Sequence, residues 1–332
     1  MARIDEVAKA AGVSISTVSY ALSGKRPVST GTRQRIEDAV QKLGYQANAG
    51  ARMLAGNRTQ IFALTEPFRA DTHAPTHMAF VLGASIAARR VGYDILLLTD
   101  AEASAGMQRV ASSGLVDGII VLDVAPDDDR VALARSIDIP TVFIGIPDEH
   151  AGLLCVDFDF EGAVELAFDK LIAAGHERIG MLGHPEHAYE VSNFPPRARD
   201  AFLGRLDAES TERIFVPIET TARAALDALL SAGVTGIILQ TTQEAHAEVT
   251  QELAERGLRV PDDISLISVG ATFDVDSFDT PLDAIPLVPQ PSCDRAVELI
   301  MQLLEDRALP AGIHLIDPIY TERGSVSHAR VL

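Results

Sequence analysis

Short apolar runs alternate with amphipathic stretches through most of this chain of 332 residues. The first four runs are rich in residues that favour β-strands, and they occupy Ile61–Leu64, Ile95–Leu98, Ile119–Leu122 and Val142–Ile144. Stretches with helical periodicity separate them near residues 77–91, 104–113 and 128–137. This order is typical of a parallel sheet that helices cover on both faces. The pattern therefore predicts a doubly wound α/β lobe.

The same pattern begins again after Asp157. The new strand-like runs are Ile179–Leu182, Ile214–Val216, Ile237–Leu239 and Ile264–Val269. Helical stretches alternate with them near residues 161–174, 197–207, 220–232 and 243–256. The segment Ala284–Pro289 and a helix near 292–306 follow, and we expect them to return to the first lobe. The sequence thus predicts an α/β body of two doubly wound, parallel-sheet lobes.

Residues 1–45 carry helical patterns in place of this alternation. A first helix is expected from about Ile4 to Ala10, and Gly12 should end it. Ser14 is a natural N-cap for a second helix, because its hydroxyl can accept a hydrogen bond from an unpaired amide. A third helix should begin at Ser29 or Thr32 and end at Gly44. The positions expected to be buried in this all-α head are Ile4, Val7, Ala8, Val13, Val18, Ala21, Leu22, Ile36, Ala39, Val40 and Leu43.

The second helix leaves an unusual set of side chains facing outward. These side chains are Ile15, Ser16, Thr17, Ser19 and Tyr20, where an ordinary surface helix would carry Lys and Glu. Short hydroxyl side chains permit close approach to DNA phosphates, and Ile15 and Tyr20 can contact base edges. We therefore interpret the head as a helix-turn-helix that enters a DNA groove. A three-helix protein-binding module is the alternative.

The distribution of charge supports contact with DNA through the head. The whole chain carries a net charge of −19, which by itself argues against nucleic acid. Residues 1–58, however, hold nine Lys or Arg and four Asp or Glu, so they carry +5 and leave −24 for the remainder. Such asymmetry indicates a small basic module that contacts phosphate, attached to a body that DNA repels.

Composition also bounds the class of protein. No apolar run approaches the roughly 18 residues of a membrane span. The N-terminal residues lack the charged and then apolar pattern of a signal peptide. Two cysteines, Cys155 and Cys293, do not suggest a disulfide framework. We therefore expect a cytoplasmic protein without a membrane partner.

Several stretches of the head resemble the lactose-repressor (LacI/GalR) family of bacterial transcription regulators. They are Val7–Leu22, Val28-Ser29 with Thr32-Arg33, and the set Tyr45, Asn48, Ala51 and Leu54. The similarity continues through the body and covers nearly the whole chain. It implies that Ile15, Ser16 and Tyr20 read bases. It also implies that Thr17, Ser19, Ser23, Ser29 and Thr32 hold phosphates.

Residues 46–58 form the linker between head and body. The family resemblance implies that this segment folds into a hinge helix on operator DNA and pairs with its dimer mate in the minor groove. Asn48 and Ala51 would contact groove edges, and Leu54 would be a wedge between base pairs. The family usually has Pro where this chain has Ala47. A plain flexible linker is the alternative.

For the body, the resemblance implies the fold of periplasmic sugar-binding proteins, with three crossings between lobes. The expected first lobe comprises residues 59–157 plus about 286–312, and the second comprises 158–285 plus about 313–332. Ligands in such sheets bind beyond the carboxyl ends of strands, so a small effector is expected between the lobes. The residues expected to contact it are Phe68, Arg69, Asp123, Tyr189, Arg197, Gln240, Thr241, Phe273 and Asp274.

The effector is expected to be a sugar or related polyol, although the sequence departs from sugar-responsive members of the family. Thr241-Thr242 stands where these members typically have Asn-Asp, and Gly270 where they typically have Asp. Asp274 or Asp276 are candidates to replace that carboxylate. A corepressor such as a purine is therefore an alternative to an inducer.

We expect a homodimeric repressor that binds a palindromic operator in double-stranded DNA. A small-molecule-binding protein or enzyme with an appended DNA-binding head is the remaining alternative, but no catalytic constellation or cofactor motif is visible. His184 and His187 are separated by three positions, but Pro185 lies between them and no third ligand lies nearby in sequence. The sequence therefore predicts no metal site.

Overall fold

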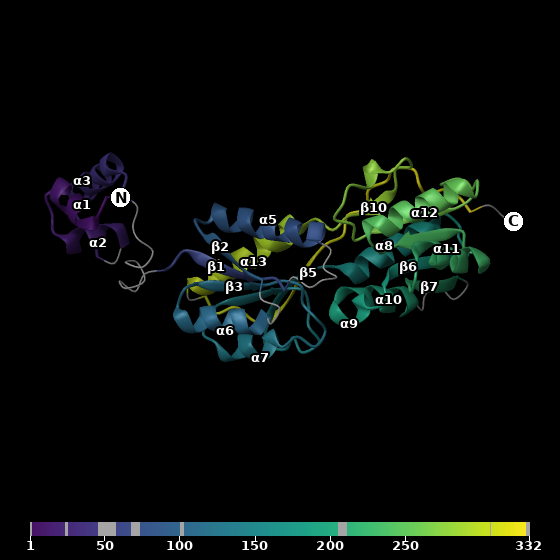
Figure 1. Ribbon diagram of the computed structural model, residues 1–332, viewed down its shortest axis with the longest axis horizontal. Helices are drawn as coiled ribbons and strands as arrows, with labels where there is room; N and C mark the ends of the chain where they lie inside the picture. The colour runs from purple at the N-terminus through teal and green to yellow at the C-terminus, as the bar shows by residue number, and fades with distance from the viewer. Residues whose placement is uncertain are drawn as a thin grey trace. The chain divides into compact units, whose positions relative to one another are not determined.

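The computed structural model describes residues 2–23, 26–45, 58–67, 74–99, 103–204, 211–305 and 307–329. The chain divides into two compact units, which are described separately (Figure 1). One unit comprises residues 1–61 with 113–117 and contains the helical head. The other comprises residues 62–112 with 118–332 and contains the α/β body. No helix in the described part of the chain is long and apolar enough to cross a membrane.

The head consists of helices α1 (Ile4–Ala11), α2 (Ile15–Ser23) and α3 (Thr30–Leu43). Its small core contains Val7, Ala8, Ala11, Val18, Ile36 and Ala39. Gly12 ends α1 in the left-handed conformation with φ of 67°, which glycine adopts without a steric cost. Two residues expected to be buried are instead 43% and 37% exposed, namely Leu22 and Leu43. Each lies in the last turn of its helix, at the margin of this small core.

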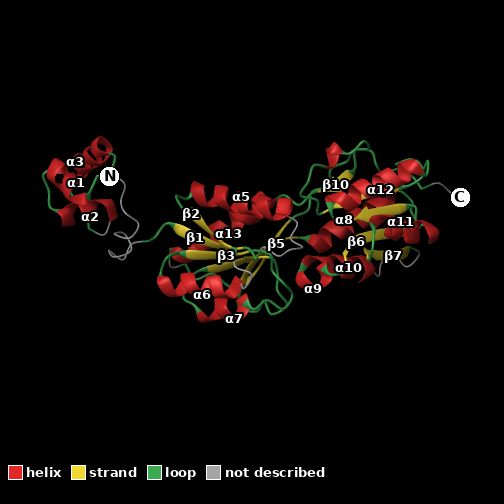
Figure 2. Ribbon diagram, in the orientation of Figure 1, coloured by secondary structure: helices red, strands yellow, loops and turns green. Residues whose placement is uncertain are grey.

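The first lobe is a six-stranded sheet in the order β11-β5-β4-β3-β1-β2. Its strands are β1 (Ile61–Thr65), β2 (Asp94–Leu98), β3 (Gly118–Val121), β4 (Thr141–Ile144), β5 (Leu154–Phe158) and β11 (Gly312–Ile316). Helices α5 (Ala74–Arg90) and α13 (Pro289–Leu304) pack side by side on one face (Figure 2). Helices α6 (Ala103–Ser113) and α7 (Arg130–Ser136) lie on the opposite face.

The second lobe is a five-stranded parallel sheet in the order β10-β9-β8-β6-β7. Its strands are β6 (Arg178–Pro185), β7 (Glu212–Ile218), β8 (Gly236–Leu239), β9 (Ser265–Val269) and β10 (Asp283–Ile285). Its helices are α8 (Phe160–Ala173), the short α9 (Ala188–Val191), α10 (Phe194–Gly204), α11 (Ala222–Ser231) and α12 (Gln243–Glu255).

Alternate residues of β8 face opposite sides of this sheet. Ile237 and Leu239 join the core under α11 and α12, whereas Ile238 joins the core under α8 and α10. A strand with helices on both faces must be apolar at every position, since successive side chains point in opposite directions. This is why the predicted strands of the body read as continuous apolar runs.

The chain crosses between the lobes three times, after Phe158, Ile285 and Ile316. Strand β11 pairs in parallel with β5, so the first lobe extends to Ile316, a few residues past the boundary expected near 312. This strand lies at the edge of the sheet, and Ile313 and Leu315 are exposed. It therefore lacks the continuous apolar pattern of the interior strands.

Both sheets reverse their strand order at an equivalent point. In the first lobe the reversal lies between β1 and β3, and in the second between β6 and β8. The helices that follow these neighbouring strands leave toward opposite faces, so a crevice opens at the carboxyl ends of the two strands. Each lobe thus contributes one crevice to the body.

Candidate functional site

Helix α2 presents a largely polar outer face on a firmly capped start. The Ser14 hydroxyl accepts a hydrogen bond of 3.1 Å from the Thr17 amide, and it lies 2.8 Å from the Ser16 hydroxyl. Ile15 is 50% exposed although it is a large apolar residue. Thr17, Ser19 and Tyr20 are half-buried, and Ser16 is exposed. The expected outward face of α2 is therefore present, and it begins with the exposed apolar side chain of Ile15.

Two further features of the head bear on contact with phosphate. The Arg26 guanidinium lies 5.1 Å from the centre of the Tyr20 ring, which places a positive charge beside this candidate base-reading residue. Ser29 caps α3 and accepts a hydrogen bond of 3.3 Å from the Thr32 amide. The side chain of Ser23 and the hinge residues Asn48, Ala51 and Leu54 lie outside the described residues.

A cavity of about 260 Å³ lies between the two lobes of the body, and we call it the cleft. The first lobe contributes Glu66, Thr76, His77, Phe80, Leu122, Asp123, Val124, Ile144, Gly145 and Asp157 to its wall. The second contributes Phe160, His184, Pro185, His187, Ala188, Val191, Ser192, Asn193, Phe194, Thr241, Thr242, Gln243, Gly270, Thr272, Phe273 and Leu287. Aromatic rings, carboxylates and hydroxyls thus line one enclosure, which suits a polar organic ligand.

Glu66, His77 and Asp123 meet at the crevice of the first lobe. Glu66 follows β1, Asp123 follows β3, and His77 lies in the first turn of α5. His77 Nδ1 lies 2.6 Å from a Glu66 carboxylate oxygen, and Glu66 is only 1% exposed. One ligand atom from each of the three residues lies within 4.8 Å of the others. Asp123 has a φ of 49°, a left-handed conformation that is uncommon outside glycine.

Arg130 fixes the two strand ends that carry Glu66 and Asp123. Its guanidinium donates to the Thr65 hydroxyl at 2.9 Å and to the Leu122 and Asp123 carbonyl oxygens at 2.8 Å each. The same guanidinium makes a double hydrogen bond to the Asp128 carboxylate. Burial alone would raise the pKa of Asp128, but Arg130 outweighs burial and holds that pKa below its ordinary value. This edge of the sheet is therefore rigidly built.

On the facing lobe, Thr241 and Thr242 follow β8. Thr241 is 5% exposed, and its hydroxyl has no hydrogen-bond partner within the described structure. Thr242 caps α12, and its carbonyl accepts a hydrogen bond of 2.8 Å from His246 Nδ1. Complete burial lowers the pKa of His246 to about 4, so the ring is neutral near pH 7. A buried hydroxyl without a partner is costly, and a bound ligand can satisfy it.

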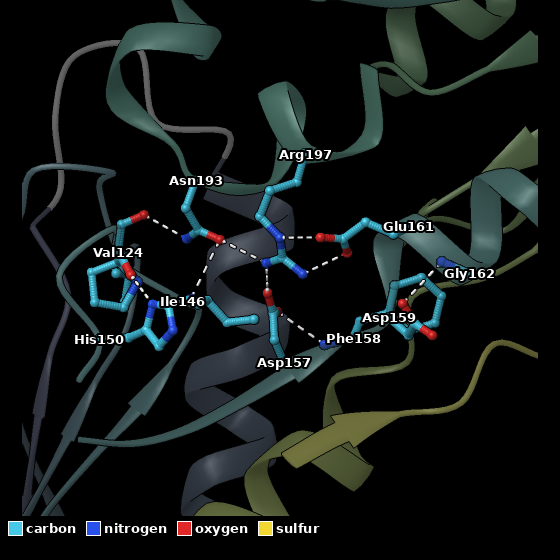
Figure 3. Close-up of polar contacts among 11 residues, drawn as sticks. Val124, Ile146, His150, Asp157, Phe158, Asp159, Glu161, Gly162, Asn193 and Arg197 are labelled. Carbon is cyan, nitrogen blue, oxygen red and sulfur yellow. Dashed lines mark hydrogen bonds and ion pairs between the residues drawn. The ribbon is translucent and has the colours of Figure 1, made fainter. Parts of the chain in front are cut away.

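Asn193 links the lobes beside the cleft. Its side-chain amide donates to the Val124 carbonyl at 2.7 Å, and its carbonyl oxygen accepts from the Ile146 amide at 3.4 Å (Figure 3). The hydroxyls of Thr76 and Thr272 also meet across the lobes, at 2.6 Å. These contacts hold the lobes together at two places on the wall of the cleft.

Arg197 lies behind this wall and binds carboxylates of its own chain. It makes a double hydrogen bond to Glu161, at 2.7 and 2.6 Å, and a third bond to Asp157 at 2.5 Å (Figure 3). Burial raises the pKa of Asp157 to about 6, although Arg197 opposes this change. Arg197, which was expected to contact the effector, thus connects α10 to β5 and α8.

The structure brings together only part of the expected effector set. Asp123, Thr241 and Phe273 line the cleft, whereas Tyr189, Arg197, Gln240 and Asp274 do not. The Tyr189 hydroxyl instead accepts a hydrogen bond from the His184 amide, and the Asp274 carboxylate accepts one from the Asp276 amide. Phe68 and Arg69 lie outside the described residues. The pairing of His77 with Glu66 was not foreseen, because 11 positions separate them and no local motif marks them.

The family comparisons divide the chain in the same way as the fold. Bacterial regulatory proteins of the lacI family match residues 3–48. The periplasmic binding proteins and sugar binding domain of the LacI family match residues 64–193, and a periplasmic binding protein-like domain matches residues 168–326. The transcriptional repressor PurR of Actinobacillus pleuropneumoniae is 30% identical over 285 residues, which cover 80% of each chain. The chain belongs to the LacI family.

Other members of the LacI family match over different lengths. The transcriptional regulator AglR of Rhizobium meliloti is 32% identical over 192 residues, which are 55% of this chain and 53% of AglR. The chain therefore spans about half the length of this relative. A crystal structure of the Lac repressor dimer bound to operator and the anti-inducer ONPF superposes with a TM-score of 0.78 at 22% identity, covering 98% of this chain and 99% of that chain. The predicted family and fold class are confirmed.

Proposed function

We propose that this chain is a ligand-responsive transcription repressor that acts in the cytoplasm as a homodimer on a palindromic operator. The exposed face of α2 carries this proposal, because an exposed Ile15 among short hydroxyls suits a DNA groove and the head matches the LacI family. Ile15, Ser16 and Tyr20 read bases in this proposal. The phosphates are bound by Thr17, Ser19, Ser23, Ser29 and Thr32. The minor groove is contacted by Asn48, Ala51 and Leu54.

A small effector occupies the cleft and lowers operator affinity. Among the residues expected from the sequence, Asp123, Thr241 and Phe273 are its contacts, and Phe68 and Arg69, which lie outside the described residues, remain candidates. Tyr189, Arg197, Gln240 and Asp274 support the surrounding wall. The class of ligand is a polyol or sugar, because carboxylates and hydroxyls stand beside the rings of Phe160, Phe194 and Phe273. A purine corepressor is the second candidate, and it would raise operator affinity.

The DNA-binding part is tested by Ile15→Ala against Leu22→Ala. Both side chains are large, apolar and exposed on α2, but only Ile15 belongs to the proposed base-reading set. In gel-shift titrations with an operator selected from random DNA, Ile15→Ala should weaken binding about tenfold or more, since burying an exposed Ile side chain contributes about 1.5–3 kcal/mol. Equal losses for the two variants would contradict the assignment.

The effector part is tested by a thermal-shift screen of the full chain against sugars, polyols, sugar phosphates, nucleosides and purines. A ligand that raises the melting temperature is then titrated into the gel-shift assay, where the sign of its effect separates inducer from corepressor. Thr241→Val should reduce its affinity about fivefold to tenfold, because a buried hydrogen bond is lost. Thr250→Val is the control, because that hydroxyl bonds only to carbonyls of its own helix.

A further inference from the structure

We propose that Glu66, His77 and Asp123 form a divalent metal-ion site in the first-lobe wall of the cleft. Two carboxylates and one imidazole are a donor set that suits first-row divalent ions such as Zn²⁺ and Mn²⁺. The imidazole makes Ca²⁺ and Mg²⁺ less suitable, because these ions prefer oxygen ligands throughout. All three residues line the cleft, so further coordination positions of the ion face the cavity.

The distances among the three residues fit this assignment. Their ligand atoms lie within 4.8 Å of one another. Donors bound to one tetrahedral Zn²⁺ at about 2.0–2.2 Å lie about 3.3–3.6 Å apart, so side-chain movements of about 1 Å would bring the three ligand atoms to that spacing. His77 would turn a ring nitrogen to the ion in place of its 2.6 Å contact with Glu66. The three residues come from different elements, and their spacing in sequence therefore hides the site.

The charge of the site also favours a dication. Glu66 is almost completely buried, and the Asp123 carboxylate lies close to it. Two neighbouring carboxylates in a poorly solvated wall repel each other, and a dication cancels their charge completely. The nearby Arg130 is committed to Thr65, Asp128 and two backbone carbonyls.

An independent observation indicates that the cleft takes a ligand. On the facing lobe, the Thr241 hydroxyl lines the same cleft and is buried without a partner. The cluster also lies between β1 and β3, where the strand order reverses and ligands bind in open α/β sheets.

The ion would have a role in effector binding, an extension that rests on the proposed function. Arg197, expected to supply positive charge to the effector, is bound by Glu161 and Asp157. A metal ion at Glu66, His77 and Asp123 would provide that charge from the opposite lobe. A ligand with adjacent hydroxyls, or with a hydroxyl beside a carboxylate, can chelate such an ion through its open positions.

The site is tested by calorimetric titration of the full chain, first stripped with a chelator, with ZnCl₂ and separately with MnCl₂. Saturable binding of one ion per chain by at least one metal is expected. Asp123→Asn and His77→Gln should each weaken it about tenfold or more. Asn accepts the left-handed conformation, so Asp123→Asn is expected to keep the fold, and circular dichroism checks this. Asp127→Asn is the matched control, because this exposed carboxylate in the same loop does not line the cleft.

Absence of saturable binding to the wild-type chain would overturn the site, and so would equal affinities for Asp123→Asn and Asp127→Asn. The titration contains neither DNA nor effector, so its failure is independent of a failure of operator binding. The thermal-shift screen is then repeated with and without the metal that binds. Polyol shifts that require the metal support the chelating role, whereas equal shifts in both conditions overturn that role and leave the metal site intact.

Discussion

The side-chain amide of Asn193 in the second lobe donates a hydrogen bond of 2.7 Å to the carbonyl oxygen of Val124 in the first. The Asn193 backbone amide donates to the same oxygen at 3.2 Å. One carbonyl thus receives two donors from the other lobe, beside the cleft. This pairing favours the closed arrangement of the lobes, and its energy contributes to the balance between closed and open forms.

Replacing this donor should open the body. Asn193→Asp puts a carboxylate against the Val124 carbonyl and loses a buried hydrogen bond, at a cost of about 1–3 kcal/mol. We expect a larger radius of gyration by small-angle scattering and weaker effector binding. Glu190→Gln is the control, since this exposed neighbour does not line the cleft. Unchanged scattering and unchanged effector affinity would contradict the role of Asn193.

Arg130→Met should destabilise the body strongly. The substitution removes every hydrogen bond that the guanidinium makes to Thr65, Leu122, Asp123 and Asp128, and it leaves the Asp128 carboxylate poorly solvated. Breaking a buried ion pair in this way costs about 3–5 kcal/mol. Urea denaturation should show this loss, whereas Arg90→Ala should change stability by less than about 1 kcal/mol because its pair with Asp294 is exposed. Similar losses for both variants would refute the difference.

His246 should make the body sensitive to acid. Its pKa is lowered to about 4 by burial, so the unfolded chain binds an extra proton between its ordinary pKa of 6.5 and pH 4. Stability from the neutral ring is therefore complete above pH 6.5 and is lost as pH falls toward 4, by up to about 3 kcal/mol. Asp157, with its pKa raised to about 6, has the opposite slope in part of this range.

The contribution of His246 is isolated by comparison with His246→Gln. The stability difference between the two proteins, measured by denaturation at several pH values, should shrink from pH 7 to pH 4. The Asp157 contribution is common to both proteins and cancels in this difference. A gap that stays constant with pH would show that the native histidine keeps an ordinary pKa.

Ser14→Ala should loosen the start of α2. The lost hydrogen bond to the Thr17 amide is the cap of this helix, and such caps are worth about 0.5–2 kcal/mol. Hydrogen exchange should become faster in peptides that cover α2 and stay unchanged in the body. Ser112→Ala is the control, because that hydroxyl bonds only to carbonyls of its own helix. Protection of α2 at the wild-type level would contradict the capping role.

Periodicity in the sequence was sufficient to predict the head and both lobes. The buried strands are short and continuously apolar, so they stand out from the helices between them. Edge strand β11 was missed because only part of its surface is covered, and alternating residues such as Ile313 and His314 weaken the signal. The register of α2 was predicted correctly at Val18 but not at Leu22, which lies near the end of its helix.

The wall of the cleft could be predicted only in part. Strand ends are visible in the sequence, which is how Asp123 and Thr241 were found. Arg197 was expected to face the ligand, but Glu161 and Asp157 capture it in the folded chain, and neither partner is close to it in sequence. The contact between Glu66 and His77 likewise forms only when the first turn of α5 packs against the end of β1. Such contacts follow from tertiary structure, and no local pattern encodes them.

The three crossings between lobes have a consequence for folding during synthesis. Cys293, Ala296 and Ile300 of α13 complete the first-lobe core, although the ribosome adds them only after the whole second sheet has been made. The second lobe must wait longer still, because Ser325 donates to the Leu266 carbonyl and backbone amides of residues 323–325 hold Asp283. The first lobe is therefore complete only after β11 and the second only after Ser325, so a nascent chain stopped short of residue 312 leaves both lobes unfinished.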